Sequence, residues 1–97
     1  MSPDSESQLL KAELNIVNAT GLHARPCHAV ASLATSFESS LVVGCHDRKV
    51  DGKSILSLMT LSAAEGDVLQ IEVSGADGEA LLQALRALVA SGFQEMS

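Results

Sequence analysis

The sequence predicts an α+β fold, with a four-stranded antiparallel sheet and three helices on one of its faces. Segments of alternating hydrophobicity and segments of helical periodicity follow one another in the order β-α-β-β-α-β-α. The strand-like segments are apolar at every second position only, which indicates a sheet with one face in water and the helices on the other. The length of 97 residues suits one small domain, and the 46% of apolar residues can form its core.

The chain opens with a polar segment before the first strand. Residues 1 to 9 lack apolar periodicity and are predicted to form a flexible N-terminal tail, so that the domain covers residues 10 to 97. Alternation begins at Lys11, and it places Leu14 and Ile16 on the same, inward face. We therefore expect a half-buried first strand.

A helix, a strand and a hairpin are expected next. Apolar residues recur at helical spacing from about Ala24 to Phe37, and Pro26 suits a first helical turn because its missing N–H costs nothing there. His46-Asp47 is a plausible turn into a short third strand near Lys49 to Asp51. The second strand, before that turn, is indicated by the alternating residues Leu41, Val43 and Cys45.

The last part of the chain predicts two helices around a fourth strand. Ser54 stands at the N-cap position of a short helix. Gly66-Asp67 then turns the chain into a strand over residues 68 to 73. The final helix is expected from about Asp77 to Ser91, with Gly92 as its stop signal. These patterns leave the order of the strands in the sheet open.

Charge and cysteine usage exclude several classes of function. The net charge of −6 argues against binding to nucleic acid or to an anionic membrane surface, and no apolar run is long enough to span a membrane. The polar start does not resemble a signal peptide, so we expect a cytoplasmic protein with reduced thiols. Cys27 and His28 face about 100° apart on their helix, and no spacing of cysteine and histidine suggests a metal site.

The most informative segment is Gly21-Leu22-His23-Ala24-Arg25-Pro26, which places a histidine at the start of a helix. A helix start offers unpaired N–H groups and the positive end of the peptide dipoles, and it therefore favours a bound anion such as a phosphoryl group. The same field disfavours the imidazolium form, which keeps the histidine neutral and nucleophilic. We predict that His23 accepts a phosphoryl group and passes it on, with Arg25 and the N–H groups of Ala24 and Arg25 holding its oxygens.

Three motifs in the same order resemble the HPr family, the phosphocarriers of the bacterial phosphoenolpyruvate-dependent phosphotransferase system (PTS). The histidine segment is similar to the active-site signature of that family, and residues 53 to 61 are similar to its regulatory-serine segment. Glu65-Gly66-Asp67, the strand after it and Ser74-Gly75-Ala76-Asp77 resemble its last strand and the entry to its final helix. The resemblance extends from about Leu10 to Glu95.

This resemblance implies an open-faced β-sandwich with strand order 1-4-2-3. It also implies a phosphocarrier that is not itself an enzyme and needs no cofactor. Enzyme I would phosphorylate His23 on Nδ1, and the group would pass to enzyme IIA components. We expect a monomer. The position after Pro26 is usually small and alanine-like in the family, and here it is Cys27. We expect Cys27 to be a buried apolar residue. Its thiol is also close enough to the imidazole in sequence to raise the question whether the site is sensitive to oxidation.

Ser54 matches the serine that a dedicated kinase phosphorylates, and a phosphorylase restores, in part of the family. An N-cap serine needs no such role, because its hydroxyl already satisfies a backbone N–H. Lys53, Ile55 and Leu58 are the candidates for the surface that docks partners. Arg25, Arg48, Lys49 and Lys53, four of the six basic residues, are expected to form a basic island around the two motifs.

Two other functions are also compatible with the sequence. The chain could serve a regulatory, nitrogen-type branch of the PTS, since Ser91-Gly92-Phe93 is similar to the end of some such carriers. Strands and helices over one sheet could also form a small-molecule-binding regulatory domain, which would need no reactive histidine. A fragment of a multidomain PTS protein is disfavoured by the starting Met1.

Overall fold

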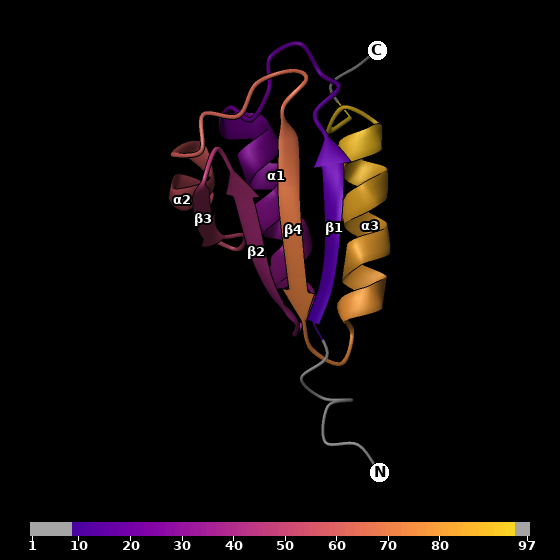
Figure 1. Ribbon diagram of the computed structural model, residues 1–97. Helices are drawn as coiled ribbons and strands as arrows, with labels where there is room; N and C mark the ends of the chain where they lie inside the picture. Colours follow the sequence, from indigo (N-terminus) through magenta and orange to yellow (C-terminus); the bar gives the residue numbers. More distant parts are fainter. Residues whose placement is uncertain (1–8, 95–97) are drawn as a thin grey trace.

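The computed structural model describes residues 9–94. Within them, four strands and three helices follow in the predicted order (Figure 1): β1 (Leu9–Asn15), α1 (Ala24–Thr35), β2 (Ser40–Cys45), β3 (Arg48–Asp51), α2 (Ile55–Met59), β4 (Val68–Ser74) and α3 (Gly78–Ala90).

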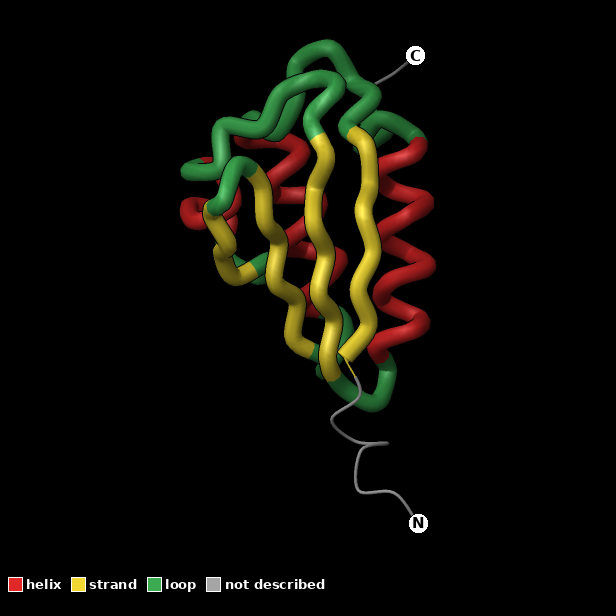
Figure 2. The backbone as a smooth tube through the Cα atoms, in the orientation of Figure 1, coloured by secondary structure: helices red, strands yellow, loops and turns green. Residues whose placement is uncertain are grey.

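The strands form one antiparallel sheet in the order β1-β4-β2-β3. This order confirms the arrangement that the family resemblance implied. The three helices lie behind the sheet in Figure 2, with α3 along β1, while the other face is uncovered by helices. The fold is therefore an open-faced sandwich with its core between sheet and helices.

The core follows from the alternation of the strands and from the apolar stripes of the helices. Alternate strand residues point toward the helices and are buried, as the sequence predicted. Leu69, Ile71 and Val73 of β4 are each no more than 2% exposed. The apolar stripes of α1 and α3 close the core from the other side, with these buried residues: Cys27, Val30, Ala31, Ala34, Leu81, Leu82, Leu85 and Val89.

Two elements begin or end two residues away from the predicted position, and the other predicted ends agree to within about one residue. β1 begins at Leu9, two residues before Lys11 and one residue inside the segment predicted to be a tail, while residues 1 to 8 lie outside the described part. α1 ends at Thr35 rather than at Phe37. The hydroxyl of Ser36 donates to the carbonyl of Leu33 at 2.6 Å, and this local hydrogen bond competes with continuation of the helix.

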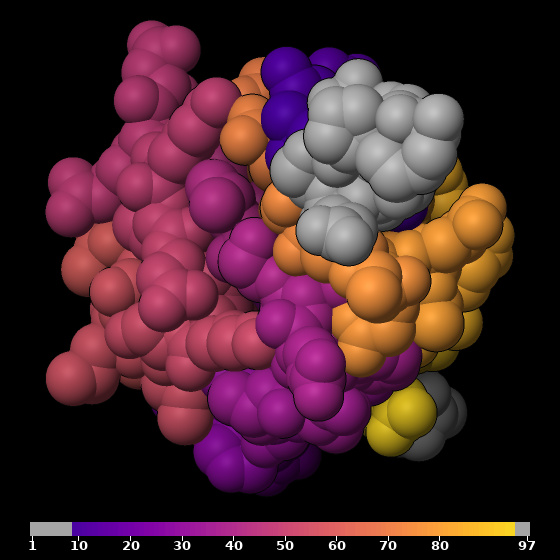
Figure 3. Space-filling model, turned by 90° about the horizontal axis from the view of Figure 1, so that it is seen from below, coloured from indigo at the N-terminus to yellow at the C-terminus, as the bar shows by residue number. Residues whose placement is uncertain are grey.

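Asp77 joins the start of α3 to the loop between α1 and β2. Its carboxylate accepts hydrogen bonds from the backbone N–H groups of Glu38 and Ser39, both at 2.9 Å, and from the Ser39 hydroxyl. It makes no side-chain cap for α3, although the sequence placed it at that helix end. In Figure 3 the magenta segment before β2 lies against the orange segment that leads into α3. These hydrogen bonds form a clamp, the Asp77 clamp, that ties the start of α3 to the loop between α1 and β2.

Among residues 9–94, no helix combines the length and the apolar character that crossing a membrane requires.

Candidate functional site

The predicted histidine segment lies at the opposite end of the sheet from the Asp77 clamp. It connects the end of β1 to the start of α1, and the loop from α2 to β4 runs over the same end (Figure 1). The two loops are hydrogen-bonded to each other, since the Leu22 N–H donates to the Ala63 carbonyl at 2.9 Å. The position of the histidine therefore depends on a loop that follows it by about forty residues in the sequence.

Gly21 allows this close contact between the loops. Its φ of +67° lies in the left-handed region that favours glycine. A Cβ at this position would stand 2.5 Å from the carbonyl oxygen of Ala63 and 2.9 Å from the Cα of Ala64. Both are backbone atoms, so only a displacement of the loop would make room for a side chain.

Asn18 braces the same loop from inside, a role that sequence reasoning missed. Its side chain is buried, and its Nδ2 donates to the Gly21 carbonyl at 3.0 Å and to the Thr20 hydroxyl at 3.2 Å. The Gly21 N–H donates in turn to the Asn18 carbonyl at 3.2 Å. The burial of this side chain depends on tertiary packing, which no local pattern in the sequence encodes.

The structure places His23 at the N-cap of α1, as predicted. The residue is exposed, its backbone is extended, and its carbonyl accepts the first helical hydrogen bond from the Cys27 N–H at 3.0 Å. Its side chain makes no cap hydrogen bond to the helix. Ala24 and Arg25 therefore lie in the first turn, where N–H groups have no acceptor within the helix, and Pro26 has no N–H to offer.

The surroundings of His23 suit a phosphoryl group. The positive end of the α1 dipole and two first-turn N–H groups directly follow His23, and no acidic residue occupies the first turn of α1. Arg25 is exposed two residues further along and brings a guanidinium, which can bind phosphoryl oxygens in a bidentate manner. The same end of the helix is thus open to water and to a docking protein.

Cys27 belongs to the core rather than to the site. Its side chain is fully buried, and Sγ lies 3.8 Å from the Leu22 carbonyl oxygen. Burial raises the pKa of this thiol to about 11. Because oxidants and alkylating agents react with the exposed thiolate, the question of oxidation beside the imidazole is answered by burial.

The second predicted motif is arranged around the start of α2. The Ser54 hydroxyl accepts a hydrogen bond from the Ser57 N–H at 3.2 Å, which confirms the predicted N-cap. Lys53 is half-buried, and its Nζ donates to the Phe37 carbonyl at 3.0 Å, beyond the end of α1. A groove of about 380 Å³ runs between α1 and α2 and is lined by Ala31, Ser32, Thr35, Lys53, Ser54, Ile55 and Leu56.

The prediction that Leu58 contacts docking partners is wrong. Leu58 is 0% exposed and belongs to the core, so it is out of reach of a partner. Ile55 is half-buried beside the groove, and the exposed apolar residues of α2 are Leu56, at 77%, and Met59, at 41%. Leu56 was missed because an apolar residue in so short a helix fits either face, and the packing of α2 against α1 decides which face is buried.

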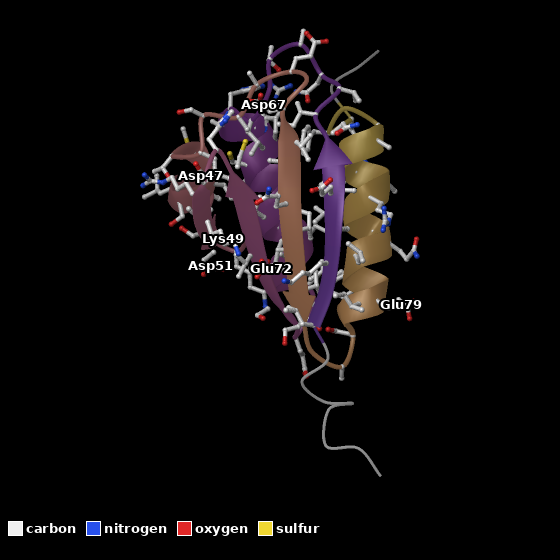
Figure 4. All side chains as sticks on the ribbon, viewed as in Figure 1. Asp47, Lys49, Asp51, Asp67, Glu72 and Glu79 are labelled. Atoms are coloured by element: carbon white, nitrogen blue, oxygen red, sulfur yellow. The ribbon has the colours of Figure 1, made fainter. Side chains whose placement is uncertain are left out.

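The four basic residues that were expected to form one basic island do not all lie together. Lys49 lies on the open face of the sheet, where its Nζ is 2.7 Å from the Glu72 carboxylate and the two side chains point toward one another (Figure 4). The hydrogen bond from Lys49 lowers the pKa of the Glu72 carboxyl group. Arg48 instead donates to the Thr60 hydroxyl at 3.2 Å. Arg25 and Lys53 remain near the two motifs.

The family model for the PTS HPr component phosphorylation site matches residues 10–91. This chain belongs to the HPr family. It is 40% identical over 87 residues to the phosphocarrier protein HPr of Neisseria meningitidis, a match that covers 90% of this chain and 98% of that protein. It is 33% identical over 88 residues to the phosphocarrier protein NPr of Shewanella violacea, covering 91% and 97% of the two chains.

Solved structures of the HPr family have the same fold. The crystal structure of HPr from Thermoanaerobacter tengcongensis superposes with a TM-score of 0.85 at 35% identity and covers 91% of this chain and 99% of that one. HPr from Bacillus anthracis superposes with a TM-score of 0.80 at 28% identity, covering 84% and 98%. The chain is thus an HPr phosphocarrier of the PTS, a non-enzymatic phosphotransfer protein with enzyme I and enzyme IIA as the partners of its family, and the small-molecule-binding alternative is set aside.

Proposed function

We propose that His23 carries the phosphoryl group in this HPr, with Arg25 and the N–H groups of Ala24 and Arg25 holding the phosphoryl oxygens. The observation that supports this most directly is an exposed imidazole at the N-cap of α1, beside a first turn whose amides have no helical acceptor. Arg25 adds charge that follows the oxygens as they move.

The transfer forms one bond to phosphorus and breaks another. The lone pair on Nδ1 of neutral His23 forms the new N–P bond, while the bonding pair between phosphorus and enzyme I returns to enzyme I. Nε2 keeps its proton, and the positive end of α1 stabilises the charge on the phosphoryl oxygens. The group then leaves Nδ1 for an enzyme IIA component by the same exchange in reverse, so the carrier returns to its starting state.

Two exposed histidines at α1 provide a matched test. We expect intact-mass spectrometry after incubation with enzyme I and phosphoenolpyruvate to show one added phosphate in the parent chain and in His28→Ala, and none in His23→Ala. His28 is exposed on the same helix, one turn further along, and serves as the control for surface changes. Unchanged incorporation in His23→Ala, with urea unfolding also unchanged, would show that another residue carries the group.

We propose further that partners dock on the surface formed by Arg25, Ile55, Leu56 and Met59, beside the groove between α1 and α2. Leu56 is the most exposed large apolar residue of the described chain, and apolar side chains next to a cation are typical of interface centres. Lys53 supports this surface from within, because its ammonium group is hydrogen-bonded to the Phe37 carbonyl. We place the protein in the cytoplasm as a monomer, in keeping with its family.

Ser54 is our proposed site for a serine kinase and phosphorylase. Its hydroxyl is half-buried at the N-cap of α2 and lies on the groove, so an added phosphate would bring negative charge to the docking surface and weaken contact with acidic enzyme I. An HPr-type kinase with ATP should phosphorylate the parent chain and Ser57→Ala but leave Ser54→Ala unmodified. Phosphorylation of Ser54→Ala to the same extent would exclude this site.

The higher identity to HPr than to NPr favours the sugar-type branch over the nitrogen-type branch. Transfer rates measured with enzyme I and enzyme IIA of each branch should be higher with the sugar-type pair, and a faster nitrogen-type pair would reverse this assignment.

A further inference from the structure

Two turns at one end of the sheet bring together Cys45, His46 and Asp67. Cys45 is the last residue of β2, His46 follows it in the turn to β3, and Asp67 directly precedes β4. Since β2 and β4 are antiparallel neighbours with Gly44 opposite Gln70, the end of β2 lies beside the start of β4. One possible ligand atom from each of the three side chains lies within 4.8 Å of the other two. Figure 4 labels Asp67 at this end of the sheet.

The backbone positions these three residues, and one backbone N–H also binds the Asp67 carboxylate. His46 Nε2 is 2.9 Å from Asp67 Oδ2, and the same oxygen accepts a hydrogen bond from the Ala64 N–H at 2.8 Å. The Asp67 carbonyl accepts from the Ile16 N–H at 3.0 Å. His46 and Asp47 both have positive φ, 54° and 67°, as a tight two-residue hairpin requires. The cluster is therefore built on a hairpin and a hydrogen-bonded turn, and the Ala64 N–H orients the carboxylate as outer-shell partners do in metal sites.

We propose that Cys45, His46 and Asp67 form a binding site for a divalent transition-metal cation, with Zn²⁺ as the best chemical fit. A thiolate, an imidazole and a carboxylate are all zinc ligands, and three protein ligands leave the fourth tetrahedral position to water. The sulfur donor disfavours Mg²⁺ and Ca²⁺, which prefer oxygen. The proposal is separate from the role of His23, and it revises the expectation that the chain has no metal site.

Binding has a defined proton balance. Burial raises the pKa of the Cys45 thiol, and the nearby Asp67 carboxylate raises it further, so the thiol is protonated before a cation arrives. The cation replaces this proton, which leaves to solvent, and binds the thiolate, the lone pair of neutral His46 and the Asp67 carboxylate. The two ligand charges of −1 then compensate the charge of +2.

The burial of the three side chains suits a metal site that opens to solvent and has its cysteine anchored in the core. Cys45 is only 2% exposed and is held in the core, whereas the side chain of His46 is 59% exposed and that of Asp67 is 28% exposed. A cation could therefore enter from solvent between the histidine and the aspartate and reach the sulfur beneath them. The ring and the carboxylate can adjust to metal–ligand distances without disturbing the core.

Sequence reasoning missed this site for an identifiable reason. Among the cysteines and histidines, only neighbouring residues such as Cys27 and His28 are close in the chain. Asp67 stands more than twenty positions beyond His46, and nothing in the local pattern connects the two. The pairing of β2 with β4 makes that connection.

Co²⁺ is the probe of choice, because a tetrahedral cobalt–thiolate site absorbs in the near ultraviolet through charge transfer from sulfur. The full chain, kept reduced with a phosphine, should develop this band with one equivalent of Co²⁺ and lose it when Zn²⁺ is added. Absence of the band in the folded parent chain would overturn the proposal.

The two core cysteines provide matched variants. Cys45→Ala should abolish the band, while Cys27→Ala should retain it. His46→Gln and Asp67→Asn, which alter the more accessible ligands, should weaken Co²⁺ binding by at least about tenfold, since even the loss of an outer-shell partner typically costs 10- to 100-fold. His28→Gln should bind like the parent. A band that survives in Cys45→Ala, or unchanged affinity in both His46→Gln and Asp67→Asn, would refute the site.

Discussion

Gly21→Ala should damage both the stability and the phosphoryl transfer of this HPr, and Gly66→Ala provides its matched control. Both glycines have positive φ, +67° and +90°, and both lie in loops at the same end of the sheet. They differ in their surroundings. A Cβ at Gly21 would meet two backbone atoms at 2.5 and 2.9 Å, whereas a Cβ at Gly66 would meet nothing within 4 Å.

The difference in surroundings sets the expected magnitudes. A side chain in the left-handed region costs roughly 1–2 kcal/mol, and this applies to both variants. At Gly21 the overlap with the loop at Ala63 and Ala64 adds about 1–3 kcal/mol, the usual cost of overpacking. The free energy of unfolding should therefore fall by about 2–5 kcal/mol in Gly21→Ala and by about 1–2 kcal/mol in Gly66→Ala. A domain of this size has about 5–15 kcal/mol in total.

Urea unfolding would measure both changes from the shift of the midpoint at constant slope. The displaced loop also carries His23, and a misplacement of about 1 Å can cost about 100-fold in rate. We therefore expect the rate of phosphorylation by enzyme I to fall strongly in Gly21→Ala and to stay near the parent value in Gly66→Ala. Equal losses of stability in the two variants would show that the contact with Ala63 does not constrain the loop.

Three further predictions concern the core, the docking surface and the loop clamp. Leu58→Ala should lower the free energy of unfolding by about 2–5 kcal/mol in urea titrations, because the side chain is fully buried. Leu56→Ala should change the free energy of unfolding by less than about 0.5 kcal/mol but raise the KM for transfer from enzyme I. The reverse pattern would contradict our assignment of the buried and exposed faces of α2. Cys27, with its pKa raised to about 11 and its side chain buried, should resist iodoacetamide in the folded Cys45→Ala chain and react in urea, as followed by mass spectrometry; equal rates in the two states would argue against burial. Hydrogen bonds from the Ser39 hydroxyl and from backbone N–H groups lower the pKa of Asp77 below its ordinary 3.8, so the stability that this carboxylate supplies is present above that pH and is lost as the pH falls through the lower folded-state pKa. Asp77→Asn should therefore be less stable at pH 7 and lose less stability on acidification, and urea midpoints that fall in parallel for parent and variant would refute the clamp.

Much of the architecture could be predicted because its signals are local. The alternation of Leu69, Ile71 and Val73, the N-cap position of Ser54 and the histidine before Ala24 and Pro26 each depend on neighbours within a few positions. The structure confirms the elements that these patterns predicted. The predictions were wrong where residues nearby in sequence do not determine the structure. This was the case for the end of α1 and for the buried face of α2.

The residues of the proposed sites also include some that local patterns predict and others that they do not. The motif from Gly21 to Pro26 was sufficient to single out His23, since helix starts and anion binding follow from residues adjacent in sequence. The brace from Asn18, the contact of Gly21 with Ala63 and the division of the basic island could not be read in this way. Each depends on which segments meet in space.

The sequence by itself therefore determined the order of the elements, the face of each strand and the histidine at the start of α1, because periodicity and capping act over one or two turns of chain. Only the tertiary structure decided which loop supports that histidine, which leucine of α2 faces solvent, and that Asp67 lies beside Cys45 and His46. The physical reason is contact between distant segments: β4 pairs between β1 and β2, and α2 packs against α1. It brings residues distant in the chain within hydrogen-bonding distance, and no local pattern encodes that proximity.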